Sequence, residues 1–112
     1  MPSGSTLTIM GGPAGTGALI ASSNGLGAGI GGGAGLDTGM GAQYKFDSQC
    51  GTITIENTVT SVKATAGSNA TNSIGAGRFT GSSSGTCTCG TVTVGDVVGA
   101  VTTSPYTYTP AP

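Results

Sequence analysis

The sequence predicts an all-β chain. More specifically, it predicts a β-solenoid built from two to three stacked long coils. A Thr-apolar-Thr-apolar quartet occurs three times. No segment has the 3.6-residue periodicity of an amphipathic helix. The 23 glycines among 112 residues would each cost a helix about 1 kcal/mol. Repeats that cannot bury an apolar face alone bury it against neighbouring repeats, as stacked β-coils do.

Composition excludes several classes of function. Charged residues make up 6% of the chain, the net charge is −1, and there is no His. Because the net charge is so small, the chain has no long-range electrostatic attraction to nucleic acid. We therefore expect no nucleic-acid partner. No nucleophile–base pair, paired acid/base site or His-ligated metal site can be assembled, so we expect no enzyme, no metal and no cofactor. No apolar run approaches the roughly 20 residues of a membrane span, so we expect no membrane insertion.

The first repeat covers about residues 6–51. Thr6–Met10 alternates polar and apolar residues, which is typical of a half-buried strand, and 11–13 (Gly-Gly-Pro) ends it. Residues 18–21 (Ala-Leu-Ile-Ala) are a candidate second strand. The glycine-rich run at 25–35 suits a tightly packed extended backbone. Residues 36–49 are less regular, and we interpret them as a protruding loop.

The second repeat, about 52–90, has the same order. Thr52–Ile55 is predicted to be a strand, with a turn at Glu56-Asn57. Val59–Ala66 alternates again, with Val62 and Ala64 predicted to point inward.

The remaining segments complete a single domain over residues 1–112. Residues 72–77 (Asn-Ser-Ile-Gly-Ala-Gly) are similar to residues 27–31 of the glycine-rich run, and 78–88 are predicted to be a second loop. The third repeat, about 91–104, turns at Gly95-Asp96 and is predicted to continue through Val97, Val98 and Val101. The tail at 105–112 is predicted to be extended and stiffened by proline.

Two coil sizes remain open. The quartets begin at Thr6, Thr52 and Thr91, which gives repeats of 46 and 39 residues. A different set of apolar residues is fairly evenly spaced and would also fit coils of roughly 20 residues: Ile9, Ile30, Ile55, Ile74 and Val94. We expect the longer coil, because the Thr quartet and the Gly-Ile-Gly motif are chemically different.

Alternation within the quartets predicts an inner and an outer face. Ile53 and Ile55 should point inward, stacked between Val92 and Val94 on one side and Leu7 and Ile9 on the other. The threonines should form two outward columns: Thr6, Thr52 and Thr91; and Thr8, Thr54 and Thr93. Threonine suits any strand surface. The columns also resemble the Thr-x-Thr rows of β-solenoid antifreeze proteins, which implies ice binding as a further possible function.

The three cysteines are Cys50, Cys87 and Cys89. Cys50 and Cys89 hold the same repeat position, so stacking would bring their Cα atoms to about 4.8 Å, the spacing of adjacent strands. A disulfide between them is possible at that distance. An inward ladder of small apolar thiols is the alternative.

The aromatic residues in the predicted loops are a candidate ligand-binding set. Tyr44 and Phe46 follow the glycine-rich run, and Phe79 follows the similar segment at 72–77. Exposed together, they would stack on sugar rings and make the chain a carbohydrate-binding module. The alternative is that they cover the open flank of the core.

The order of the motifs resembles one known group of proteins. Gly27–Gly33 (Gly-Ala-Gly-Ile-Gly-Gly-Gly), Cys50–Ile55 (Cys-Gly-Thr-Ile-Thr-Ile) and Val62–Ala66 occur in the order seen in Gly-rich repeat surface proteins of gut Bacteroidota and Firmicutes. Residues 72–77, 89–94 and 103–108 are similar to the closing repeat of such proteins. The resemblance implies a β-solenoid on the cell surface or secreted. It supplies no catalytic residues.

These observations together predict a non-catalytic structural or adhesive module that presents the segments 36–49 and 78–88 from a rigid body. The expected location is extracellular or the bacterial cell surface, with any secretion signal outside this sequence. Glycans or other surface proteins are the expected partners. Because no convincing polar cap is visible at the N-terminal side, we also expect either a longer array or self-association through the coil ends.

Overall fold

The computed structural model describes residues 4–12, 17–37, 45–81 and 85–110. Every regular element in these residues is a strand, so the all-β class is confirmed. The strands are β1 (Thr6–Ile9), β2 (Ala18–Ser22), β3 (Ile30–Gly31), β4 (Gly35–Asp37), β5 (Lys45–Phe46), β6 (Ser48–Cys50), β7 (Thr52–Ile55), β8 (Ser61–Thr65), β9 (Ile74–Gly75), β10 (Phe79–Gly81), β11 (Cys87–Cys89), β12 (Val92–Val94), β13 (Val97–Val98) and β14 (Tyr106–Tyr108).

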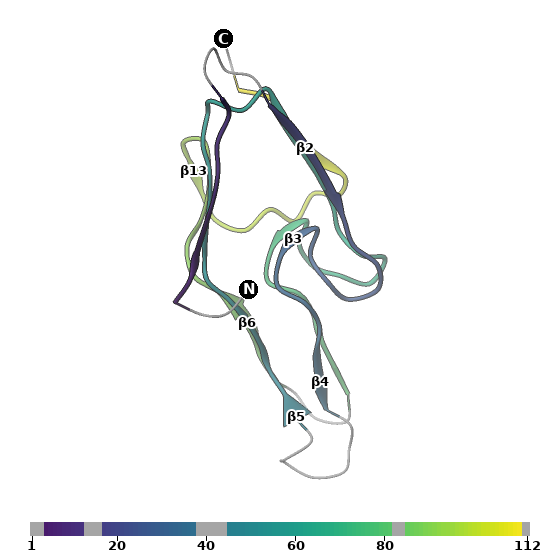
Figure 1. Ribbon diagram of the computed structural model, residues 1–112. Coiled ribbons are helices and arrows are strands. Elements are labelled where there is room, and N and C mark those ends of the chain that lie inside the picture. Colours follow the sequence, from purple (N-terminus) through teal and green to yellow (C-terminus); the bar gives the residue numbers. More distant parts are fainter. Residues whose placement is uncertain (1–3, 13–16, 38–44, 82–84, 111–112) are drawn as a thin grey trace.

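The strands form five small sheets. Three of them mix parallel and antiparallel pairs, in the orders β1-β7-β12-β13, β14-β8-β2 and β10-β4-β5. The other two are the parallel pairs β3-β9 and β11-β6. In Figure 1 the first two sheets are the opposite walls of a wide body, and β4, β5 and β6 extend from it as a narrow arm. The arm also includes β10 and β11, which pair with β4 and β6.

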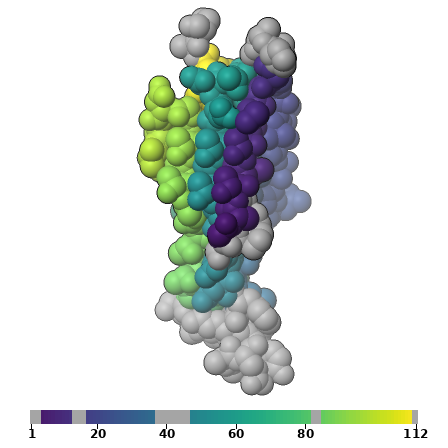
Figure 2. Space-filling view, turned by 60° about the vertical axis from the view of Figure 1, so that its left-hand side comes forward, coloured from purple at the N-terminus to yellow at the C-terminus, as the bar shows by residue number. Residues whose placement is uncertain are grey.

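Parallel pairing joins equivalent positions of successive repeats. Thr6 pairs with Thr52, and Ile53 pairs with Val92. Ile30 pairs with Ile74, so the Gly-Ile-Gly motif and the similar segment at 72–77 also lie side by side. Figure 2 shows β1 in purple, the β7 segment in teal and the β12–β13 segment in green across one face. The sequence separation of the paired residues is that of the longer repeat, and not the roughly 20 residues of the shorter coil.

The core lies between the two walls of the body. Ile53, Ile55, Val62 and Ala64 have no exposed surface, which confirms the predicted inward positions. Ile74 is equally buried and comes from β9, in the segment at 72–77. The buried side chains therefore form one cluster shared by both walls and the β3-β9 pair.

The first repeat is less buried than its sequence suggests. Leu7 pairs with Ile53 as predicted, but it remains 37% exposed, and Ile9 is only partly buried. The prediction that Leu7 is a core residue is therefore wrong. β1 is the terminal strand of its sheet, so a second strand covers Ile53 but not Leu7.

The glycine-rich run packs backbone against backbone. A Cβ on Gly29 would lie 2.8 Å from the Thr65 carbonyl oxygen and 3.0 Å from that of Ser73. Gly31 and its partner Gly75 both have positive φ, 130° and 134°, which favours glycine. The two segments approach so closely that a Cβ on Gly31 would overlap the Gly75 carbonyl.

The prediction of loops at 36–49 and 78–88 is wrong for most of the described residues. β4, β5 and β6 occupy much of the first segment, and β10 and β11 occupy much of the second. Phe79 pairs with Gly35, and Thr88 with Gln49. Stacking gives each irregular segment a backbone partner in the next repeat, which local sequence pattern does not reveal. Residues 38–44 and 82–84 lie outside the described residues.

The third repeat reverses direction at its predicted turn. The turn at Gly95-Asp96 is confirmed, and Gly95 adopts φ 60°, as tight hairpins require. β13 then runs antiparallel to β12. Val101 forms an antiparallel bridge with Ile74, and the tail docks as β14, antiparallel to β8. The predicted continuation through Val97, Val98 and Val101 is therefore present, as an antiparallel strand and a bridge.

Candidate functional site

The outward threonines of the β1-β7-β12 sheet are the most regular polar surface of the body. Thr8, Thr54 and Thr93 lie in register on three adjacent strands. Neighbouring strands are about 4.8 Å apart, so these three side chains form one straight column. Thr8 is exposed, and Thr54 and Thr93 are half-buried beside their neighbours.

The second threonine column is shorter in strict strand register. Thr6 pairs with Thr52. Thr91 lies one residue before β12, and its carbonyl oxygen accepts a hydrogen bond from the Ile53 amide at 2.9 Å. The next position beyond Thr93 is Val98 of β13, which is 70% exposed. The hydroxyl face is therefore three rows deep and ends on a valine.

The chemistry of this face is that of neutral hydroxyl and methyl groups. The quartets that form β1 and β7 read Thr-Leu-Thr-Ile and Thr-Ile-Thr-Ile, and β12 reads Val-Thr-Val. None of these strands carries a charge. Such a surface can bind by shape and by hydrogen bonds, but it offers no proton-transfer group for catalysis.

A disulfide ties the end of the first repeat to the end of the second, beside this sheet. Cys50 and Cys89 are bonded, with a Cα–Cα distance of 4.4 Å and a sequence separation of 39. They are register partners in the β6–β11 pair. Each is followed by a glycine that leads toward a Thr-containing strand. Of the two arrangements left open by the sequence, the structure contains the bridge.

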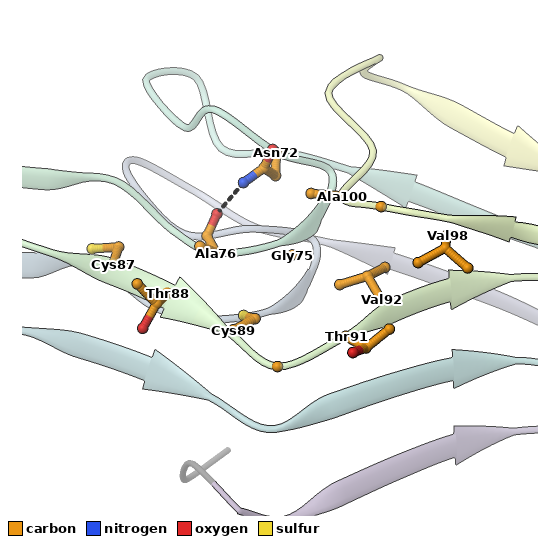
Figure 3. A pocket seen from close by; sticks show the side chains of 12 residues that line it. Asn72, Gly75, Ala76, Cys87, Thr88, Cys89, Thr91, Val92, Val98 and Ala100 are labelled. Atoms are coloured by element: carbon orange, nitrogen blue, oxygen red, sulfur yellow. Dashed lines mark hydrogen bonds between the residues drawn. The ribbon is translucent and has the colours of Figure 1, made fainter.

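A shallow hollow lies next to the disulfide, and sequence reasoning missed it. Its volume is about 390 Å³, and its lining includes Asn72, Cys87, Cys89 and Ala100. Figure 3 shows the Asn72 side chain donating to the Ala76 carbonyl oxygen, at 2.8 Å. The free thiol of Cys87 is half-buried. The hollow exists because the chain after β13 returns across β9, which no local motif indicates.

Of the predicted aromatic set, Phe46 and Phe79 lie on opposite sides of β4 and are not on adjacent strands. Tyr44 lies outside the described residues. Phe79 pairs with Gly35 on one edge of β4, whereas Phe46 pairs with Leu36 on the other edge. The Phe79 ring lies against Gly85, where an added Cβ would be 2.6 Å from ring atom Cδ2. This contact favours a covering role for Phe79 over a free platform for sugars.

Two further observations apply to the described residues. They contain no group of three or more His, Cys, Asp or Glu side chains placed to hold a metal ion. Within the same residues there is no helix with the length and apolar character needed to cross a membrane. Among the residues that line the hollow, Cys87 contributes a thiol, and Thr88 and Thr91 contribute hydroxyl groups.

No family model, curated protein or solved structure matches this chain. The resemblance to Gly-rich bacterial surface repeats therefore stays a prediction from its motifs.

Proposed function

We propose that this chain is a non-catalytic structural or adhesive module of a bacterial cell-surface or secreted protein. In this proposal the parallel pairs are successive coils of a short β-solenoid. The coils hold out the arm, which contains the described parts of 36–49 and 78–88, for contact with a surface or partner.

The observation that carries the proposal is the in-register pairing of equivalent repeat positions on both walls of the body. β1 pairs with β7 over four residues, and β2 pairs with β8 over five. The Cys50–Cys89 bond adds a covalent link between repeats. Cross-linked, fully paired backbones suit a spacer that must stay rigid under load, and disulfides persist in the oxidising conditions outside the cytosol.

Adhesion is tested with beads that carry the purified chain. The beads are offered bacterial cells, mucin-type glycoproteins and a glycan array, with albumin-coated beads as the baseline. Leu36 in the arm is 42% exposed, so Leu36→Glu should weaken adhesion at least severalfold. Thr107→Glu adds the same charge on the exposed centre of β14 and should leave adhesion unchanged. Binding no stronger than the albumin baseline on every surface would remove the adhesive function.

The threonine columns support a second candidate, an ice-binding face. The column of Thr8, Thr54 and Thr93 is in register, and a flat array of hydroxyl and methyl groups is the surface that the antifreeze resemblance implies. Thermal hysteresis and ice-crystal shaping of the purified chain test it. Thr54→Lys should abolish both effects, whereas Thr107→Lys on β14 should not. A chain that shapes no ice at millimolar concentration would end this candidate.

A further inference from the structure

The two ends of the strand stack differ in whether their unpaired edge strands carry features that prevent pairing with another chain. At the C-terminal end, β13 has only two residues, and β14 has three. Pro105 and Pro110 stand on either side of β14 and have no amide to donate. Short strands and prolines are the devices by which natural sheets avoid pairing with other chains.

The N-terminal end has no such protection in its described strands. β1 (Thr-Leu-Thr-Ile) and β2 (Ala-Leu-Ile-Ala-Ser) are terminal strands of their sheets and contain neither charge nor proline. Longer, neutral and apolar edge strands are the kind that pair with another chain.

The hydrogen bonds of β2 show which of its backbone groups face outward. The Gly17 carbonyl accepts from the Thr60 amide, and the Ser23 amide donates to the Thr65 carbonyl. Residues in a strand alternate between its two edges. The odd-numbered residues of this segment therefore face β8, and Ala18, Ile20 and Ser22 direct their amides and carbonyls to the open edge.

This open edge is centred on an apolar residue that the fold does not bury. Ile20 is 78% exposed, and it is the middle residue of β2. The inward residue beside it, Leu19, remains 36% exposed. A hollow of about 150 Å³ next to it is lined by Ile9, Met10, Gly17, Ala18, Leu19 and Val59. Ile20 lies on the outer face of the sheet, beside the exposed Lys63. Leu19 lies on the inner face, and it is more exposed than its register partner Val62, which is fully buried.

The end face is also large enough to be an interface. A four-stranded sheet spans about 14 Å from first to last strand, which corresponds to the shortest dimension of the molecule, 53 × 27 × 18 Å. The ends of the stack are therefore its broad faces, of up to 53 × 27 Å. A standard interface needs about 800 Å² from each partner.

We infer that β2 is a dimerisation edge that pairs antiparallel with β2 of a second copy, about a two-fold axis at Ile20. The outward groups at Ala18, Ile20 and Ser22 are symmetric about Ile20, so the edge is self-complementary. Two Ile20 side chains then lie opposite each other, where cross-strand apolar pairs stabilise a sheet. The same sheet already accepts an antiparallel strand at its other end, where β14 pairs with β8. The product is one six-stranded sheet through two molecules.

The first test is the oligomeric state of matched Ile20 variants. Light scattering and sedimentation should show a dimer for the wild-type chain. Ile20→Pro removes the outward amide at the centre of the pairing without removing a β2–β8 hydrogen bond, and it should raise the dimer dissociation constant at least 100-fold. Ile20→Thr keeps the amide and should weaken the dimer less. A wild-type chain that is monomeric up to millimolar concentration overturns the inference.

The second test is independent of how well the proline variant folds. In a Cys87→Ser background, Ile20→Cys should form a disulfide-linked dimer on mild oxidation, because the two-fold axis places the two residues opposite each other. Val98→Cys, which is as exposed at the C-terminal end, should not. Cross-linking through Val98 and not through Ile20 would overturn the inference in favour of another contact. The arm is not part of this edge, so a monomeric variant that still adheres leaves the proposed function intact.

Discussion

The body and the arm are held together by different forces. In the body, side chains from both walls meet in a buried cluster that includes Ile53, Ile55 and Val62. Where the arm begins, the chain instead relies on the close approach of backbones: Gly32 lies so near Gly77 that an added Cβ would be 3.2 Å from its amide nitrogen. A chain with few large apolar residues thus keeps one apolar core and uses glycine contacts and a disulfide elsewhere.

The largest expected effect is the loss of a core side chain in the body. Ile55 has no exposed surface, so Ile55→Ala should lower the free energy of unfolding by about 3–4 kcal/mol, since it removes apolar contacts and leaves a cavity. Ile20→Ala makes the same chemical change at a position that is 78% exposed. Its effect on a monomeric sample should be about 0.5 kcal/mol or less. Equal losses in denaturant titrations would show that the body does not depend on this core.

The next effect concerns the bond at the start of the arm. Reduction of Cys50–Cys89 should lower the free energy of unfolding by about 3 kcal/mol, because a closed loop of 39 residues no longer restricts the unfolded chain. Cys87→Ser should leave the oxidised stability nearly unchanged, since Cys87 is a free thiol. Peptide mapping of the oxidised chain checks the pairing. A bridge that contains Cys87 would contradict this account.

Glycine packing at the base of the arm should matter at one position and not at a near neighbour. Gly31→Ala introduces a Cβ that overlaps the Gly75 carbonyl at φ 130°, which should cost about 2 kcal/mol. Gly33→Ala is the matched control, because nothing lies within 4 Å of its added Cβ. It should be neutral or stabilising by up to about 1 kcal/mol, through reduced freedom of the unfolded chain. Identical melting curves for the two variants would contradict backbone packing at Gly31.

The same contrast explains how far the sequence could predict the fold. Thr52–Ile55 and Val59–Ala66 alternate strictly, and their inward residues are those the pattern indicates. In the arm, Gly35 and Phe79 are register partners, but their neighbours show no alternation that would predict a strand. Pairing there depends on the next repeat, a long-range contact that no local pattern records.

The candidate site shows the same limit. The threonine columns follow from repetition alone, because residues at equivalent repeat positions stack. The hollow beside Cys87 does not, since it needs the reversal at Gly95-Asp96 and the return of the chain to Val101. The Gly-Asp pair predicts a tight turn. It does not predict which strand the chain contacts after the turn, and the hollow depends on that contact.

The smallest expected effect on the free energy of unfolding comes from a substitution on the outer face of the body, at Thr54. Thr54 stands between Ile53 and Ile55 on β7, yet it faces the other side of the sheet. Thr54→Val replaces a hydroxyl with a methyl group on a strand that tolerates both, so the free energy of unfolding should change by less than about 1 kcal/mol. Denaturant titration measures this change. If the loss instead approached that of Ile55→Ala, the threonine column would be a stabilising hydrogen-bonded ladder, and its hydroxyls would be engaged with each other instead of available to a ligand or to ice.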